Sequence, residues 1–195
     1  KALKEAIESV SSGGTLKLSG TFKATSGDDS GEIILSKALT IQGNSSATIN
    51  ADNKCRIFNL QNYLKLKDVT LLNGDATSSD DTNGGAVCVS NILGELKIEG
   101  STCIVPSTGS DENTPGKNDV YLKDGRMIDI VGALTGTAPV ARITPETYSP
   151  TTQVLSGNIT SGTPQNYKKF KVTRDGATQW YVDSDGELTT TQPSP

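Results

Sequence analysis

The chain has 195 residues and a formal net charge of −4; 33% of it is hydrophobic and only 5% is aromatic. This length is enough to bury a substantial core, and the abundance of Gly, Ser, Thr, Asn and Asp favours short strands and frequent turns over a helical bundle. The negative charge argues against a nucleic-acid-binding groove, which needs a basic face. The absence of histidine and of Cys-x-x-Cys spacing excludes a conventional zinc site.

No apolar run approaches the roughly 20 residues that span a bilayer, so no membrane span is expected. The chain begins at Lys1 and carries no signal peptide. We therefore interpret it as a mature fragment from which any export or anchoring segment has been removed.

Residues 1–12 are predicted to form a short amphipathic helix, which the Ser-Ser-Gly-Gly run at 11–14 would end. Its apolar stripe consists of Leu3, Ala6, Ile7 and Val10. A stack of strands exposes apolar interior and unpaired backbone at its open end, so we expect this helix to cap that end.

Between residues 15 and 143 short apolar strands recur in a fixed order. After the first strands, within 15–25, a polar loop followed by short apolar runs appears four times. The middle runs begin at residues 39, 64, 96 and 127, so the repeats are 25 to 32 residues long, as in stacked repeat proteins. The pattern predicts an all-β coil that stacks on copies of itself.

The longer repeats carry their extra residues at one place in the cycle, just before the first strand of each set. These inserts are 27–31, 51–54, 74–84 and 107–118. If the sets stack in register, all four loops emerge along one edge. Insertions confined to one face of such a stack often mark its binding side.

Residues 144–188 interrupt the pattern with three prolines and are predicted to form a small β cap over the far end. This segment holds the only tryptophan and three of the five tyrosines. Bulky aromatic side chains can cover an exposed last coil. Residues 189–195 are expected to form a disordered tail.

Three segments carry a resemblance to a known family: Asn83-Gly84-Gly85-Ala86-Val87, Gly94-Glu95-Leu96-Lys97-Ile98 and Gly116-Lys117-Asn118-Asp119-Val120-Tyr121-Leu122. They resemble repeats of right-handed parallel β-helix surface proteins of bacteria, of the polymorphic outer-membrane-protein type. The opening segments Leu3–Ile7 and Gly13–Leu18 look like the entry of pectate-lyase-like β-helices. Residues 144–188 are similar to the terminal module that accompanies such repeats.

The resemblance implies a right-handed parallel β-helix over residues 1–143, a bacterial origin and a secreted or cell-surface location. It also implies a non-enzymatic adhesive or structural role, in which acidic loops are presented from one edge to a host or matrix protein or a glycan. The alternative is a calcium-dependent polysaccharide-active enzyme of the lyase type, or a carbohydrate-binding module.

Acidic residues gather in the inserted loops, and aligned loops could supply oxygen ligands for calcium. The candidate ligands are Asp75, Asp80, Asp81, Asp111, Glu112 and Asp119. The other interpretation is that these carboxylates keep exposed turns soluble and deter edge pairing. No other cofactor is expected.

No residue is predicted to be catalytic. A serine hydrolase would need a histidine, and the sequence holds neither a Gly-x-Ser-x-Gly motif nor a phosphate-binding glycine loop. A lyase would need a basic residue beside calcium carboxylates, whereas the four arginines lie in different strand classes or in the cap. Mobile loops would hold the two carboxylates of a glycosidase poorly.

Clustered aromatic residues in the cap are the candidates for ligand contact, as a platform on which sugars stack. They are Tyr167, Phe170, Trp180 and Tyr181. The other interpretation is that they serve only in packing. The neighbouring run 168–171 is interpreted as a solvated strand face.

Three cysteines cannot all pair, and Cys88 and Cys103 lie in apolar strands. The first interpretation is that both are buried small hydrophobes. A disulfide between Cys88 and Cys103 is the alternative, which spacing alone does not decide.

Overall fold

The computed structural model describes residues 2–24, 31–44, 46–77 and 82–194. Within these ranges the chain is mostly β, as predicted, with three parallel sheets that we call A, B and C. A single α-helix, α1 (Ala2–Ser9), precedes them in the described ranges. None of the described helices has the length and apolar content that a membrane crossing requires.

Sheets A and C have six strands each and sheet B has four. Sheet A consists of β1 (Thr15–Leu18), β4 (Leu39–Gly43), β7 (Tyr63–Lys67), β10 (Glu95–Gly100), β13 (Ile128–Leu134) and β15 (Leu155–Gly157). Sheet B consists of β2 (Thr21–Lys23), β5 (Thr48–Asn50), β8 (Thr70–Leu72) and β11 (Cys103–Ile104). Sheet C consists of β3 (Ile33–Leu35), β6 (Phe58–Leu60), β9 (Val87–Val89), β12 (Val120–Leu122), β14 (Ala141–Pro145) and β16 (Phe170–Val172).

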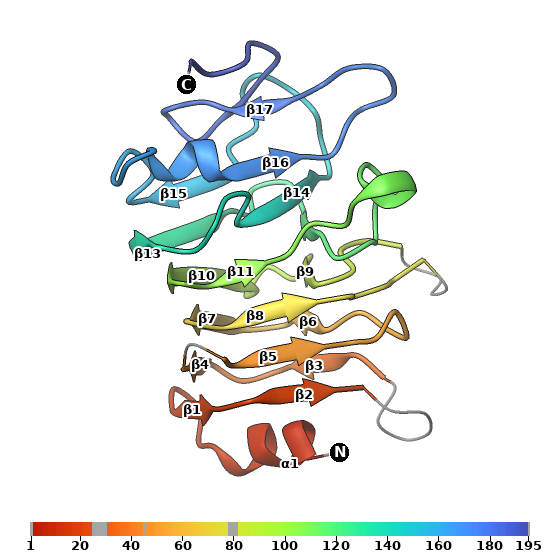
Figure 1. Cartoon of the computed structure of the whole chain (residues 1–195), viewed down its shortest axis with the longest axis vertical. Helices are drawn as coiled ribbons and strands as arrows, with labels where there is room; N and C mark the ends of the chain where they lie inside the picture. The colour runs from red at the N-terminus through yellow and green to blue at the C-terminus, as the bar shows by residue number, and fades with distance from the viewer. Residues whose placement is uncertain (1, 25–30, 45, 78–81, 195) are drawn as a thin grey trace.

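The chain visits the three sheets in turn. It passes through β1, β2 and β3, and then β4 returns to sheet A beside β1 in parallel. Four such circuits follow one another, and two further passes, β13 to β14 and β15 to β16, run from sheet A to sheet C without a strand in sheet B. Figure 1 shows the circuits as successive layers above α1. The predicted repetition of short parallel strands is therefore confirmed.

Strand register places aliphatic side chains in columns that fill the interior. Alternate residues of a strand point to opposite faces, so the same positions of each circuit point inward. One column of sheet A consists of Leu39, Leu64, Leu96, Ile128 and Leu155, and a second of Ile41, Leu66, Ile98 and Ile130, all fully buried. The matching column of sheet C contains Phe58, Val87, Val120, Ile143 and Val172.

Helix α1 lies at one end of the stack, beside β1 and β2 (Figure 1). Its residue Ile7 belongs to the buried core, and Leu3 and Val10 pack against that core. The chain turns at Gly13, whose φ of 79° is a left-handed conformation that glycine adopts without steric cost. The predicted apolar stripe is thus the face that packs, although the helix is shorter than the 1–12 expected.

The inserted loops share one corner of the molecule where the structure describes them. Residues 51–54, 107–118 and the described parts of 74–84 each connect a strand of sheet B to the next strand of sheet C. Successive loops touch, since Asp75 N donates to Cys55 O at 2.9 Å and Ala76 N donates to Gly116 O at 2.9 Å. Of the first insert, 27–31, only Gly31 lies within the described residues.

The parallel sheets continue past the expected boundary at residue 143. Strand β14 spans residue 143. It lies in sheet C beside β12, and not in sheet B beside β11. Strands β15 and β16 then extend sheets A and C by one layer each. Only afterwards does an antiparallel pair form, β17 (Tyr181–Val182) with β18 (Leu188–Thr189), so Thr189 of the expected tail is part of a strand.

Asn118 ties neighbouring loops together from a buried position. Its Oδ1 accepts a hydrogen bond from Gly74 N at 2.8 Å, and its Nδ2 donates to Leu71 O at 3.2 Å and to Val105 O at 2.6 Å. The side chain thereby binds Leu71 O and Gly74 N of the preceding circuit and Val105 O of its own circuit. Asn118 is only 2% exposed, so water cannot easily replace these hydrogen bonds.

We expect Asn118→Ala to lower the free energy of unfolding by about 2 to 3 kcal/mol, because Gly74 N and Val105 O lose the partner that Asn118 gives them, while Leu71 O keeps the hydrogen bond from Val105 N. Urea denaturation followed by circular dichroism measures this. Asn91→Ala is the matched control, since the side chain of Asn91 accepts an exposed hydrogen bond from Leu93 N; it should cost less than about 1 kcal/mol. Equal losses in the two variants would contradict the role given to Asn118.

Candidate functional site

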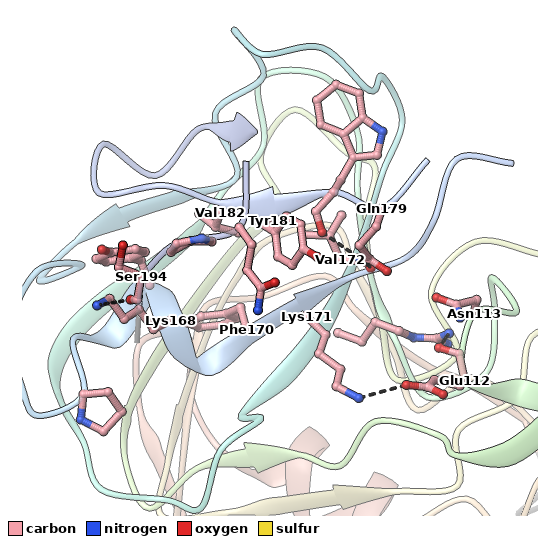
Figure 2. A pocket seen from close by; sticks show the side chains of 16 residues that line it. Glu112, Asn113, Lys168, Phe170, Lys171, Val172, Gln179, Tyr181, Val182 and Ser194 are labelled. Carbon is pink, nitrogen blue, oxygen red and sulfur yellow. Dashed lines mark hydrogen bonds and ion pairs between the residues drawn. The ribbon is translucent and has the colours of Figure 1, made fainter. Parts of the chain in front are cut away.

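A groove of about 580 Å³ opens beside β16, the last strand of sheet C. Its walls come from the loop residues Glu112 and Asn113, from the segment 164–172, from 179–182 and from 192–194 (Figure 2). The groove thus joins parts of the chain that are far apart in sequence. It is lined by all four aromatic residues singled out above and by one of the acidic candidates: Tyr167, Phe170, Trp180, Tyr181 and Glu112.

Three of the aromatic residues line the groove and also belong to the core. Tyr167, Phe170 and Trp180 are each less than 10% exposed and belong to the core cluster, whereas Tyr181 is half-buried. Tyr148 packs beside Trp180 with ring centroids 6.0 Å apart, and burial raises the pKa of Tyr148 to about 12. Packing and ligand contact are therefore compatible roles for this cluster.

Tyr167 and Phe170 are placed by a 3-10 helix, η2 (Asn166–Lys169), that leads directly into β16. Tyr181 is fixed by its backbone pairing with Thr189 across the β17–β18 pair. Within the run 168–171, Lys169 departs from the predicted solvated face. It is buried and its Nζ donates to Leu134 O, because η2 turns that side chain inward.

Polar groups form the rim of the groove. Lys171 Nζ lies 3.0 Å from Glu112 Oε1, and both side chains are about half exposed (Figure 2). The hydrogen bond and positive charge of Lys171 lower the pKa of Glu112. Gln179 Nε2 donates to Val172 O at 3.2 Å and to Trp180 O at 2.7 Å. Such a rim can orient a ligand by hydrogen bonds around an apolar floor.

Arg142 holds the loop that supplies Glu112 and Asn113. Its guanidinium is buried and donates to four backbone carbonyl oxygens of one loop, at distances of 2.6 to 3.2 Å. The acceptors are Asp111, Glu112, Thr114 and Lys117. Sequence reasoning missed this role. One feature of the sequence could have indicated it. Arg142 stands between Ala141 and Ile143, which face inward, so the alternation of a strand places the Arg142 side chain on the outer face of the sheet.

The candidate calcium ligands do not share one environment. Asp75 pairs with Lys117 and accepts from Thr77, Glu112 pairs with Lys171, and Asp119 is buried, where it accepts from Gly85 N and Thr144 Oγ1. Asp111 lies in a second 3-10 helix, η1 (Gly109–Asp111), and Asp80 and Asp81 lie outside the described residues. Among the described residues, no three acidic, cysteine or histidine side chains are placed to hold a metal ion. The calcium hypothesis stays a prediction.

We expect the ion pair of Asp75 to make stability depend on pH. Burial opposes the charged carboxylate, but hydrogen bonds from Lys117 and Thr77 outweigh it and lower the pKa of Asp75 below 3.8. The folded state therefore binds fewer protons than the unfolded state. The pair stabilises the protein above about pH 4, and this contribution is lost as the pH falls through the lowered pKa.

Asp75→Asn should lower the free energy of unfolding by about 1 to 3 kcal/mol at pH 7 and by less at pH 2. Urea denaturation of both proteins at the two pH values measures the difference. A loss of equal size at both pH values would show that the charge of Asp75 is not what stabilises the loop.

The three cysteines, all within the described residues, form no disulfide. Cys88 belongs to β9 in sheet C and Cys103 to β11 in sheet B, so they lie on different sheets. Burial raises the pKa of the Cys55 and Cys103 thiols, which disfavours the reactive thiolate.

Glu112 is the only carboxylate among the described residues that line the groove. Comparison of the chain with protein-family models, with curated proteins and with solved structures found no match.

Proposed function

We propose that the chain is a right-handed parallel β-helix. The order in which the chain visits sheets A, B and C, circuit after circuit, supports this architecture. Its handedness follows from the general rule that crossovers between parallel strands of one sheet are right-handed. Residues beyond β16 would then close the last layer.

On this scaffold we infer a non-enzymatic binding module, adhesive or structural, of a secreted or cell-surface protein of a bacterium. The resemblance of the glycine-containing repeats to bacterial surface proteins supports the location. A rigid stack with loops gathered at one corner supports the role, because such a scaffold presents variable loops without moving itself.

The observation that carries the proposal is the groove beside β16. A volume of about 580 Å³ is within the range of ligand sites, and an apolar floor with a few polar groups at the rim is the usual composition of such sites. A host or matrix protein or a glycan would bind there, with Tyr181 as the more accessible aromatic contact.

An array of glycans and extracellular-matrix proteins tests this function. We expect the natural chain to bind at least one class, and Tyr181→Ala to weaken that binding about tenfold or more, because an interface aromatic residue is lost. Tyr63→Ala is the matched control, since Tyr63 is a half-buried tyrosine of sheet A that does not line the groove.

Equal binding by Tyr181→Ala and Tyr63→Ala would show that the ligand site lies outside the groove. Release of unsaturated products from acidic polysaccharides in the presence of calcium would overturn the non-enzymatic assignment. Binding of no array member would reject the module as an adhesin for these ligand classes.

A further inference from the structure

Strand β16 lines the groove and has one edge without a hydrogen-bonded strand, although β17 packs close to it. It is the terminal strand of sheet C and pairs with β14 on its other side only, within the described chain. The carbonyl oxygen of Val172 accepts from the side chain of Gln179, 3.2 Å away, instead of from another strand. Backbone groups of this kind are complementary to the backbone of an extended peptide.

A peptide already lies against this groove, and it belongs to the same chain. Gln192, Pro193 and Ser194 line the groove after the chain leaves β18. Lys168 Nζ donates to the carbonyl oxygen of Ser194 at 2.6 Å (Figure 2). Residues 192–194 therefore show how a segment containing a proline is accommodated there.

The segment 190–194 is only lightly held. Among its described residues, only Pro193 is partly buried, and the others are exposed. Apart from the Lys168 contact, the hydrogen bond described for it is a local one from Thr191 N to Thr189 Oγ1. Because few contacts would be lost on its departure, the segment can be displaced at small cost.

We propose that the groove is a binding site for extended, proline-containing peptide segments, and that residues 190–194 are its resident and displaceable occupant. Proline fixes φ and lacks a backbone N–H, so such a segment loses little entropy on binding and suits a groove lined by aromatic side chains. The inference rests on the proposed binding function and names the ligand chemistry of the same site.

The resident segment would act as a competitor in cis. A ligand can bind fully only when 190–194 is displaced, so its apparent affinity is reduced by the fraction of molecules in which the groove is occupied. A tethered competitor acts at a high effective concentration, so even a weakly held segment can block the groove.

The test uses the acetylated synthetic peptide Thr-Thr-Gln-Pro-Ser-Pro, which is the sequence of residues 190–195. It is titrated into the full chain and into a chain that ends at Thr189, with the fluorescence of Trp180 as the signal, because this only tryptophan lines the groove. We expect the shortened chain to bind the peptide at least about tenfold more tightly than the full chain.

A second variant retains residues 190–194 in the chain. Pro193→Asp in the full chain should weaken the binding of this segment to the groove, so that the peptide binds with an affinity close to that for the shortened chain. Pro150→Asp is the matched control, an exposed proline outside the groove, and should behave as the natural chain does. Lys168→Met in the shortened chain should weaken the peptide severalfold, because the contact to the Ser194 carbonyl is lost.

Equal affinity of the full and shortened chains, or no binding by either, would overturn the inference. A peptide in which both prolines are replaced by glycine should bind at least about fivefold more weakly, and unchanged binding would overturn the preference for proline. These results are separate from the array. A peptide difference without array binding rejects only the proposed function, and array binding without a peptide difference rejects only this inference.

Discussion

Leu66→Ala is expected to lower the free energy of unfolding by about 4 kcal/mol, within the range found for large-to-small changes in protein cores. Leu66 is fully buried in β7 and stands between Ile41 of β4 and Ile98 of β10 in one column of sheet A. Strands on both sides are fixed by their own backbone pairing, so the column cannot collapse into the cavity. Urea denaturation followed by far-ultraviolet circular dichroism measures the loss.

Leu93→Ala is the matched control for this prediction. Leu93 is 67% exposed in the turn between β9 and β10, so its truncation should change stability by less than about 0.5 kcal/mol. If Leu66→Ala cost as little as Leu93→Ala, the inner column would not be the source of stability that the register indicates.

Gly85→Ala is expected to destabilise the protein by about 3 kcal/mol or more, because a Cβ atom has no room there. It would lie 2.1 Å from Gly116 O and 2.5 Å from Asn118 N, which are backbone atoms of the next loop, and 2.6 Å from Gly74 O of its own loop. The second glycine of the Gly-Gly-Ala element is thus required by the close approach of two successive layers. Thermal unfolding and urea denaturation both report the effect.

The control for Gly85 is Gly31→Ala. A Cβ atom there would meet only the end of the flexible Lys4 side chain, at 3.3 Å, so the change should cost less than about 0.5 kcal/mol. A Gly85→Ala protein as stable as Gly31→Ala would mean that the layers can move apart at the loop corner.

The strands could be predicted from the sequence because their pattern is local. A run such as Leu64-Lys65-Leu66 alternates apolar and polar residues with the period of a strand, and its repetition in order predicts stacking. The later layers could not be predicted as well. Strand β15, which reads Leu-Ser-Gly, has no apolar alternation, and it is recognised only by its pairing with β13.

The candidate site was predictable only in part. The cluster of aromatic residues near the end of the chain drew attention to Tyr167, Phe170, Trp180 and Tyr181, and the structure places all four along one groove. Nothing in the local sequence indicated that Arg142 holds the loop of Glu112, or that residues 192–194 lie against the same groove. The hydrogen bonds that make these contacts, Arg142 to Glu112 and Lys168 to Ser194, join residues 30 and 26 positions apart.

The sequence by itself determined which short segments become strands, the order in which they recur and the apolar stripe of α1, because each depends on neighbours a few residues away. Only the tertiary structure decided that sheet B ends at β11, that Lys169 is buried while Lys171 reaches Glu112, and that a groove forms beside the open edge of β16. Those features depend on how distant layers pack against one another, and packing between layers leaves no local pattern in the residues that take part in it.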